Sequence, residues 1–160
     1  SGYSQVLTFP PSGDNQKSSI SQYMGLVEVN ITYNSPDVHS PSGDDRRGNI
    51  WGALVPYGLM NLGFGMSTAD NPSPWRSGAN ENTTIRFSHD VEVQGQPVKA
   101  GIYGLFFIPE EGDWTLILSK DYTSWGSYFY NPKNDVLRVK VSPKNSEYHE
   151  YLTYEFDNRK

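Results

Sequence analysis

The segment 75–84 carries the densest group of hydrogen-bonding side chains in the sequence, and it reads Trp-Arg-Ser-Gly-Ala-Asn-Glu-Asn-Thr-Thr. The guanidinium of Arg76 is a planar fork of donors that suits a carboxylate or a phosphate. Asn80 and Glu81 add hydrogen-bond acceptors, and a strand pattern follows directly, so a scaffold can hold these side chains rigidly. The segment predicts a polar ligand pocket with Trp75 as its apolar wall.

Two alternatives give the same residues other roles. In the first, Arg76 and Glu81 form an internal ion pair that fixes a long loop to the domain, since buried charges usually occur in pairs. In the second, the protein is a hydrolase that uses Glu81 as general acid or base while Arg76 binds an anionic group. A Glu81 that contacts only Arg76 would stay ionised and make a poor general acid at neutral pH. We therefore expect a non-catalytic domain.

A run of aromatic residues, Trp-Gly-Ser-Tyr-Phe-Tyr, covers residues 125–130. An exposed row of such rings beside polar groups would suit stacking against sugars, but alternate residues that pack into the core are the more common arrangement. The expected partner is a small polar or carbohydrate-like ligand or a cell-envelope protein, and a purely structural domain stays an alternative. The candidate ligand-binding residues are Trp75, Arg76, Asn80, Glu81, Thr83 and Trp125.

Other chemistry has weak support. The three histidines, His39, His89 and His149, are far apart in the sequence, and the Asp44-Asp45 pair lacks the spacing of a calcium loop. The contiguous residues 88–90, Ser-His-Asp, would point their side chains apart on a strand or turn. There is no cysteine and no glycine-rich phosphate motif. No catalytic residue, metal site or cofactor is predicted.

Composition excludes several classes of partner. The 160 residues fit one domain, and the net charge of −5 with no basic patch argues against nucleic-acid binding. No apolar run reaches the roughly 18 residues of a membrane span. The oligomeric state is open.

The hydrophobic pattern has a period of two in several stretches, which predicts half-buried strands, and no stretch predicts more than a short helical turn, at 51–60. Residues 102–108 are apolar on both faces, so we expect that strand at the centre of a layer. Gln-Gly-Gln-Pro at 94–97 predicts a hairpin turn. Seven or eight short strands predict an all-β fold, an antiparallel β-sandwich with long Gly/Pro-rich loops, with a jelly-roll or a barrel as variants. The predicted strands cover 27–33, 83–88, 91–93, 102–108, 114–119, 137–141 and 151–156.

The expected organisation is a polar, extended lead-in over residues 1–21 and a single β-sandwich domain over 22–160. The segments 35–49 and 61–81 read as long loops, and a loop of this length is usually functional. The chain stops four residues after its last predicted strand. We therefore expect a domain truncated at its C-terminal end.

Several motifs occur in an order that resembles the bacterial family known as domain of unknown function 2911. The resemblance covers roughly residues 22–156, and its most specific block is the Trp-Arg-Ser-Gly-Ala-Asn-Glu of 75–81. The motifs that carry it are Ile50–Gly58, Trp75–Glu81, Ala100–Phe106, Trp114–Lys120, Trp125-Gly126 and Asp135–Val139.

The resemblance implies no activity. It places the signature polar residues of the family on Arg76, Asn80 and Glu81, and it makes Leu59–Pro74 an insertion relative to shorter members. Members typically carry a signal peptide or lipid anchor ahead of the domain. The resemblance therefore implies a periplasmic, cell-surface or secreted location, with that leader absent from this chain.

Overall fold

The computed structural model describes residues 15–40, 42–144, 152 and 154 of the chain. These residues form eight strands and one short 3₁₀ helix, η1, and they contain no α-helix. The elements are β1 (Gln16–Met24), β2 (Val27–Ser35), β3 (Thr84–Phe87), β4 (Val91–Val93), β5 (Gln96–Val98), β6 (Gly101–Ile108), β7 (Trp114–Ser119), η1 (Pro132–Asn134) and β8 (Asp135–Val141).

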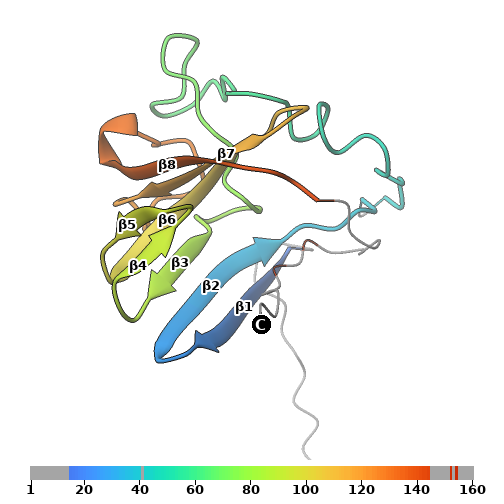
Figure 1. Ribbon diagram of the computed structural model, residues 1–160. Coiled ribbons are helices and arrows are strands. Elements are labelled where there is room, and N and C mark those ends of the chain that lie inside the picture. Colours follow the sequence, from blue (N-terminus) through green and yellow to red (C-terminus); the bar gives the residue numbers. More distant parts are fainter. Residues whose placement is uncertain (1–14, 41, 145–151, 153, 155–160) are drawn as a thin grey trace, which may run out of the picture.

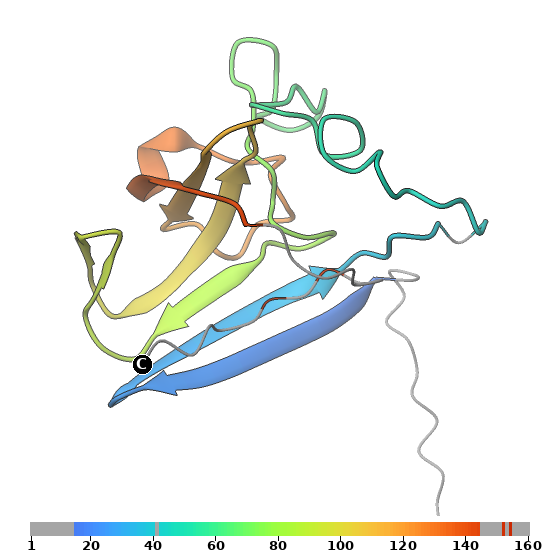
Figure 2. The ribbon, with the colours of Figure 1, turned by 45° about the vertical axis from the view of Figure 1, so that its right-hand side comes forward.

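Six of the strands form one antiparallel sheet in the order β1-β2-β3-β6-β7-β8, and β4 pairs with β5 in a separate two-stranded hairpin. The β1–β2 hairpin extends along one edge of the large sheet (Figures 1 and 2). Because β1 and β8 are edge strands, the described strands do not close into a barrel. The prediction of an all-β antiparallel fold is confirmed, and the arrangement is consistent with a β-sandwich.

Strand β6 lies between β3 and β7, and both of its faces are covered from Leu105 to Ile108, whereas Ile102 near its start is exposed. Leu105 packs into one core cluster with Phe107 at its border, while Phe106 and Ile108 belong to a second cluster on the opposite face. This is the expected consequence of a strand that is apolar at every position. The predicted central place of this strand is confirmed.

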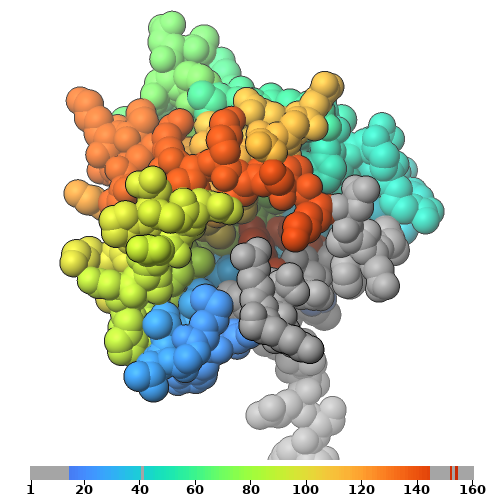
Figure 3. Space-filling view, in the orientation of Figure 1, coloured from blue at the N-terminus to red at the C-terminus, as the bar shows by residue number. Residues whose placement is uncertain are grey.

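The β4–β5 hairpin covers the face of the sheet on which Leu105 lies. Val98 is buried in the first cluster, and Val91 and Val93 pack against it. The turn between the strands has Gln94 at φ 49° and Gly95 at φ 77°, the left-handed geometry that tight hairpins require. The hairpin lies beside β8 in the space-filling view (Figure 3), and the predicted turn is confirmed.

The opposite face is covered by the segment between β7 and β8. Tyr130 is buried against Phe106, and its hydroxyl donates to the Asp135 carboxylate at 2.7 Å while it accepts from Arg138 at 2.7 Å. Burial raises the pKa of Tyr130, so the hydroxyl keeps its proton. The predicted packing of the aromatic run into the core holds for Tyr130, whereas Trp125 is exposed.

Strand β1 lies partly where the sequence predicts only a polar lead-in. Residues 16–21 of that stretch pair in register with β2. Their own pattern is polar because β1 is an edge strand with little burial on either face, so its order comes from the ladder with β2 rather than from apolar side chains. Residues 1–14 lie outside the described part of the chain.

The long connection between β2 and β3 lies along one end of the sheet and appears in cyan to green in Figures 1 and 2. It contains turns and isolated bridges, and the helical turn expected at 51–60 is replaced by a bridge between Trp51 and Val55. Apart from Ser35, which ends β2, the described residues of 35–49 and 61–81 lie outside the strands, as predicted. The strand predicted at 151–156 falls almost wholly outside the described residues, of which only Leu152 and Tyr154 are described there.

Replacing Ile117 by Ala should lower the free energy of unfolding by about 2–5 kcal/mol, because its side chain is fully buried and a cavity would remain. The matched control is Ile102→Ala, on the neighbouring strand β6 at a side chain that is 40% exposed. Urea unfolding measures both. Equal losses in the two variants would contradict the described core.

Candidate ligand clefts

The polar segment of the sequence forms a tight turn attached to β6 at both ends. The Trp75 N–H donates to the Phe107 carbonyl at 2.8 Å, and the Leu105 N–H donates to the Thr83 carbonyl at 2.8 Å. Between these attachments, Ser77 has φ 60° and Asn80 has φ 57°. A left-handed backbone is uncommon outside glycine and persists where surrounding contacts fix it.

Hydrogen bonds from several elements supply those contacts. The Ala79 N–H donates to the carbonyl of Asn34 at the end of β2, at 3.0 Å. The carbonyl of Ser77 accepts from the Thr83 hydroxyl at 3.1 Å and from the Tyr154 hydroxyl at 2.7 Å. Burial raises the pKa of Tyr154, which keeps that donor protonated. Thr83 is fully buried, so its hydroxyl positions the turn.

The turn separates the two charged residues that the sequence suggests as a pair. Arg76 Nε donates to the Gly78 carbonyl at 3.3 Å, and no carboxylate of the described residues lies within ion-pair distance of this guanidinium. Glu81 pairs instead with Lys17 of β1, at 3.3 Å, with both side chains about half exposed. The alternative of an internal Arg76–Glu81 pair is wrong for the described residues, because the left-handed turn directs the two side chains to different clefts.

Arg76 and Trp75 line a cleft of about 1030 Å³, which we call the arginine cleft. It lies between the turn, the long β2–β3 connection and the segment after Trp125. Trp51 packs edge-to-face on both Trp75 and Trp114, with centroids 5.3 and 4.7 Å away. The apolar side chains of the wall include Trp51, Leu54, Tyr57, Met60, Trp75 and Tyr128.

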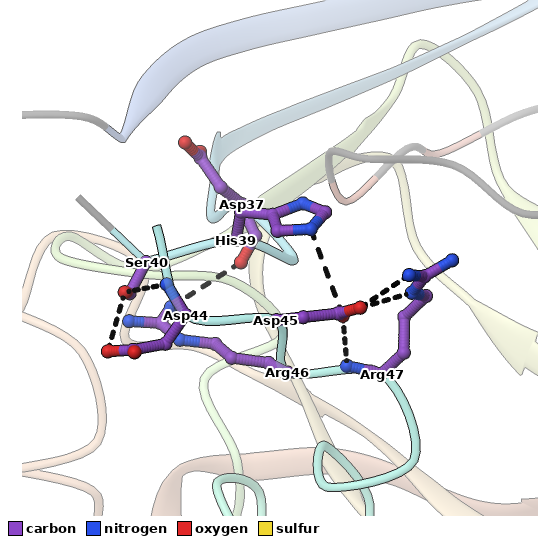
Figure 4. Close-up of polar contacts among 7 residues, drawn as sticks. All are labelled: Asp37, His39, Ser40, Asp44, Asp45, Arg46 and Arg47. Atoms are coloured by element: carbon purple, nitrogen blue, oxygen red, sulfur yellow. Dashed lines mark hydrogen bonds and ion pairs between the residues drawn. The ribbon is translucent and has the colours of Figure 1, made fainter. Parts of the chain in front are cut away.

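The charged residues that line the arginine cleft are three arginines, Arg46, Arg47 and Arg76, and one acid, Asp37. Arg46 donates to the Asp37 carbonyl at 3.4 Å. Arg47 binds the carboxylate of Asp45 with its Nε at 2.7 Å and its backbone N–H at 2.9 Å (Figure 4). Arg76 is therefore the arginine of this cleft without an ion-pair partner among the described carboxylates. The pKa of Asp44, in contrast, is lowered by hydrogen bonds from Ser42 and Ser40 and also by the charge of Arg46.

The loop that carries Arg46 and Arg47 is itself ordered by hydrogen bonds. The Arg46 N–H donates to the Val38 carbonyl at 3.1 Å, and the Ser40 N–H donates to the Asp44 carbonyl at 2.9 Å. The hydrogen bonds from Arg47 lower the pKa of Asp45 to about 2, with a smaller contribution from the nearby His39. Asp45 thus stays ionised and holds Arg47 in place.

Glu81 and Trp125 line a second, smaller cleft of about 450 Å³, which we call the Trp125 cleft. Between the clefts, Asn80 accepts from Asn15 through its side-chain oxygen at 3.3 Å, while its Nδ2 is buried with no partner among the described residues. Of the six candidate residues, Trp75 and Arg76 line the arginine cleft and Glu81 and Trp125 line the Trp125 cleft, while Asn80 and Thr83 line neither.

A hydrolase needs an acid–base partner for Glu81, and the Trp125 cleft offers no second carboxylate among the described residues that line it. The contiguous Ser88 and His89 do contact, with Oγ and Nδ1 2.8 Å apart, contrary to the expectation that these side chains point apart. Asp90 binds Lys99 and the Ala100 N–H instead of the histidine, so the arrangement is not a catalytic triad.

Comparison with known proteins places the chain in a family. A family model described as protein of unknown function (DUF2911) matches residues 15–160, which includes β1 and both clefts. The chain belongs to the DUF2911 family. No curated protein and no solved structure gives a significant match.

Membership in DUF2911 does not indicate an activity, since the family is described as of unknown function. In the described part of this DUF2911 chain, no group of three or more His, Asp or Glu side chains is placed to hold a metal ion. The described residues also contain no helix that is long and apolar enough to cross a membrane.

Sequence reasoning missed the half of the arginine cleft that comes from the β2–β3 connection. Arg46 and Arg47 directly follow Asp44-Asp45, a pair considered only as a calcium loop, and Trp51 and Tyr57 lie in a stretch that predicts only a short helical turn. The charge run and the aromatic residues of this long loop were the available signals. Because these residues are far from Arg76 in the sequence, the sequence alone does not indicate that they share a cleft with it.

In this DUF2911 chain, Gly78→Ala should lower the free energy of unfolding by about 1–3 kcal/mol, because an added methyl group overpacks the turn. A Cβ there would lie 2.8 Å from the Asn34 carbonyl oxygen and 3.0 Å from the Thr83 hydroxyl oxygen. Gly112→Ala is the control, since a Cβ at that glycine meets no atom within 4 Å. Thermal and urea unfolding measure the stability of both variants. A Gly78→Ala variant that is as stable as the wild type would contradict the tight turn.

Arg47→Ala should raise the pKa of Asp45 from about 2 toward 3.8, because the largest stabilisation of the carboxylate is lost. A depressed carboxyl pKa stabilises the folded state above the unfolded pKa, and this contribution disappears as the pH falls from about 4 to about 2. The variant should lose that contribution. NMR titration of the carboxyl carbon measures the shift, with His39→Ala as a control of small effect. An unchanged pKa in Arg47→Ala would refute the assignment.

Proposed function

We propose that the domain binds a small organic anion, a carboxylate or phosphate with an apolar or aromatic body, in the arginine cleft and does not transform it. The observation that carries the proposal is the position of Arg76, a guanidinium without a carboxylate partner among the described residues in a wall that also contains Trp75. Such a site combines an apolar surface with a few fixed polar groups, as small-molecule sites usually do.

The position of Arg76 is fixed before any ligand arrives. Its Nε is held by the Gly78 carbonyl, and its stem lies against Gly126, where a Cβ would come within 2.9 Å of Arg76 Cδ. The terminal nitrogens remain for a bidentate contact with a carboxylate or phosphate. A side chain ordered in advance loses little entropy on binding.

Two further features support an anion. Arg46 adds a second cation to the same wall, where Asp37 is the one acid among the described lining residues, although the Asp44 carboxylate offsets part of the Arg46 charge. Ser127 also lines the cleft, and its Oγ is buried with no hydrogen-bond partner among the described residues. A buried hydroxyl without a partner is costly, and a small shift of the cleft wall would let a ligand oxygen satisfy it.

The remaining alternatives have less support. A cell-envelope protein as the partner would use the same exposed loops, and a purely structural domain would leave Arg76 without a role. The periplasmic or cell-surface location is part of the proposal and rests on the family resemblance.

The test is titration of the 160-residue chain with 2-naphthoate, 1-naphthyl phosphate and the uncharged 2-naphthamide, followed by calorimetry and by tryptophan fluorescence, since Trp51 and Trp75 line the cleft. Arg76→Ala should weaken binding of the two anions about ten- to hundredfold, because a hydrogen bond to a charged group contributes about 1.5–3 kcal/mol. Arg46→Ala should weaken binding of the two anions by a smaller factor. Because Arg46 lies in an open loop, this variant still tests the site if Arg76→Ala fails to fold.

The matched control is Arg86→Ala, which removes an arginine of β3 that pairs with Glu28 outside the cleft. This variant should bind as the wild type does. Equal affinity for 2-naphthamide and 2-naphthoate, or full affinity in folded Arg76→Ala, would contradict an anion site at Arg76. Absence of binding for both anions would also count against the proposal.

A further inference from the structure

The Trp125 cleft has a different chemistry from the arginine cleft. Two aromatic side chains on one short loop line it, Tyr122 and Trp125, and they are 41% and 47% exposed. Large aromatic side chains are costly to leave in water and usually pack into the core. Two such rings on one loop at the same cleft offer a stacking surface for a ligand.

Hydrogen bonds from several sides hold the loop that carries these rings. The Asp121 carboxylate accepts from the N–H groups of Thr123 and Ser124 at 3.2 and 3.3 Å, and it also bonds the Ser124 hydroxyl. Asn82 fixes the loop from the side, since its N–H donates to the Ser124 carbonyl at 3.2 Å and its Nδ2 to the Asp121 carbonyl at 3.4 Å. The exposed rings are therefore held in place by polar contacts beneath them.

The loop is also packed closely on the sheet below. A Cβ at Gly104, in β6, would collide with the Asp121 carbonyl oxygen. The Lys120 N–H donates to the Asn134 carbonyl at 2.9 Å, which fixes the start of the loop. A ligand that stacks on Trp125 meets a surface already in its final position, and little ordering cost is left for binding.

The rest of the wall is polar and nearly neutral. Lys17 and Glu81 face each other at 3.3 Å and offer both donors and acceptors. Thr32 and Thr84 add hydroxyl groups. Asn82 is buried, and its Oδ1 has no hydrogen-bond partner among the described residues. The cleft thus combines stacking surfaces with many uncharged or paired hydrogen-bonding groups.

This combination excludes several ligand classes. Single-stranded nucleic acid also stacks on aromatic rings, but it needs a positively charged groove, and the one cation among the described residues that line this cleft, Lys17, is paired with Glu81. A purely apolar ligand would leave the polar wall without partners. A sugar ring has an apolar C–H face for the aromatic rings and hydroxyl edges for the polar groups.

We infer that the Trp125 cleft is a second binding site, separate from the arginine cleft, and that it takes a neutral oligosaccharide. Trp125 and Tyr122 stack on the sugar faces. The Lys17–Glu81 pair and the hydroxyl groups of Thr32 and Thr84 bind the sugar hydroxyls. The inference does not depend on the proposed anion site, because the two clefts have no lining residue in common.

The experiment uses the 160-residue chain and four named probes: cellotetraose, maltotetraose, mannotetraose and tetra-N-acetylchitotetraose. Saturation-transfer NMR detects binding, and calorimetry measures Kd. At least one probe should bind, and Trp125→Ala should weaken its binding about tenfold or more, as expected for an aromatic side chain that dominates a site. Tyr122→Ala is the second variant, and Tyr23→Ala, at an aromatic residue that is 68% exposed outside both clefts, is the control.

Arg76→Ala should leave oligosaccharide binding unchanged, so failure of the anion site and failure of this site give different results. Binding that survives in folded Trp125→Ala and Tyr122→Ala, or that is lost equally in Tyr23→Ala, would overturn the inference. Absence of binding for all four probes would overturn it as well.

Discussion

The left-handed turn between Ser77 and Asn80 is the constraint on which both clefts depend. Two non-glycine residues with positive φ are unfavourable by themselves, so the turn exists because its surroundings fix it. The carbonyl of Asn34 holds it from β2, and the hydroxyls of Thr83 and Tyr154 hold it from beneath. Without these hydrogen bonds, Arg76 would be a mobile surface arginine close to a glutamate.

The turn also acts as the wall between the two clefts. Three segments pass from one cleft to the other: 33–38 at the end of β2, 75–84 through the turn itself, and 122–128 after β7. Each contributes polar or aromatic residues to both sides. The division places the unpaired guanidinium in a large apolar cleft and the Lys17–Glu81 pair in a small polar one. Opposite chemistry on the two sides of one turn argues for two ligands rather than one.

Much of this arrangement follows from the sequence alone. The apolar residues on both faces of 102–108 require a central strand, and Arg76 beside Trp75 predicts a cation in an apolar wall. The separation of Arg76 from Glu81 did not follow, because serine and asparagine give no local sign that they will be left-handed. Strand β1 was missed since its order comes from pairing with β2. Arg46 was missed because only the tertiary fold brings it to the cleft of Arg76.

If the turn between Ser77 and Asn80 divides two independent sites, their ligands should bind side by side without competition. The most direct measurement is a two-dimensional amide NMR titration of the chain, first with 2-naphthoate, then with the oligosaccharide that binds most tightly, then with both. We expect two separate sets of perturbed amides, one around Arg46, Arg76 and Tyr128 and the other around Lys17, Asn82 and Trp125, with both ligands bound at the same time. Overlapping sets, or displacement of one ligand by the other, would contradict it.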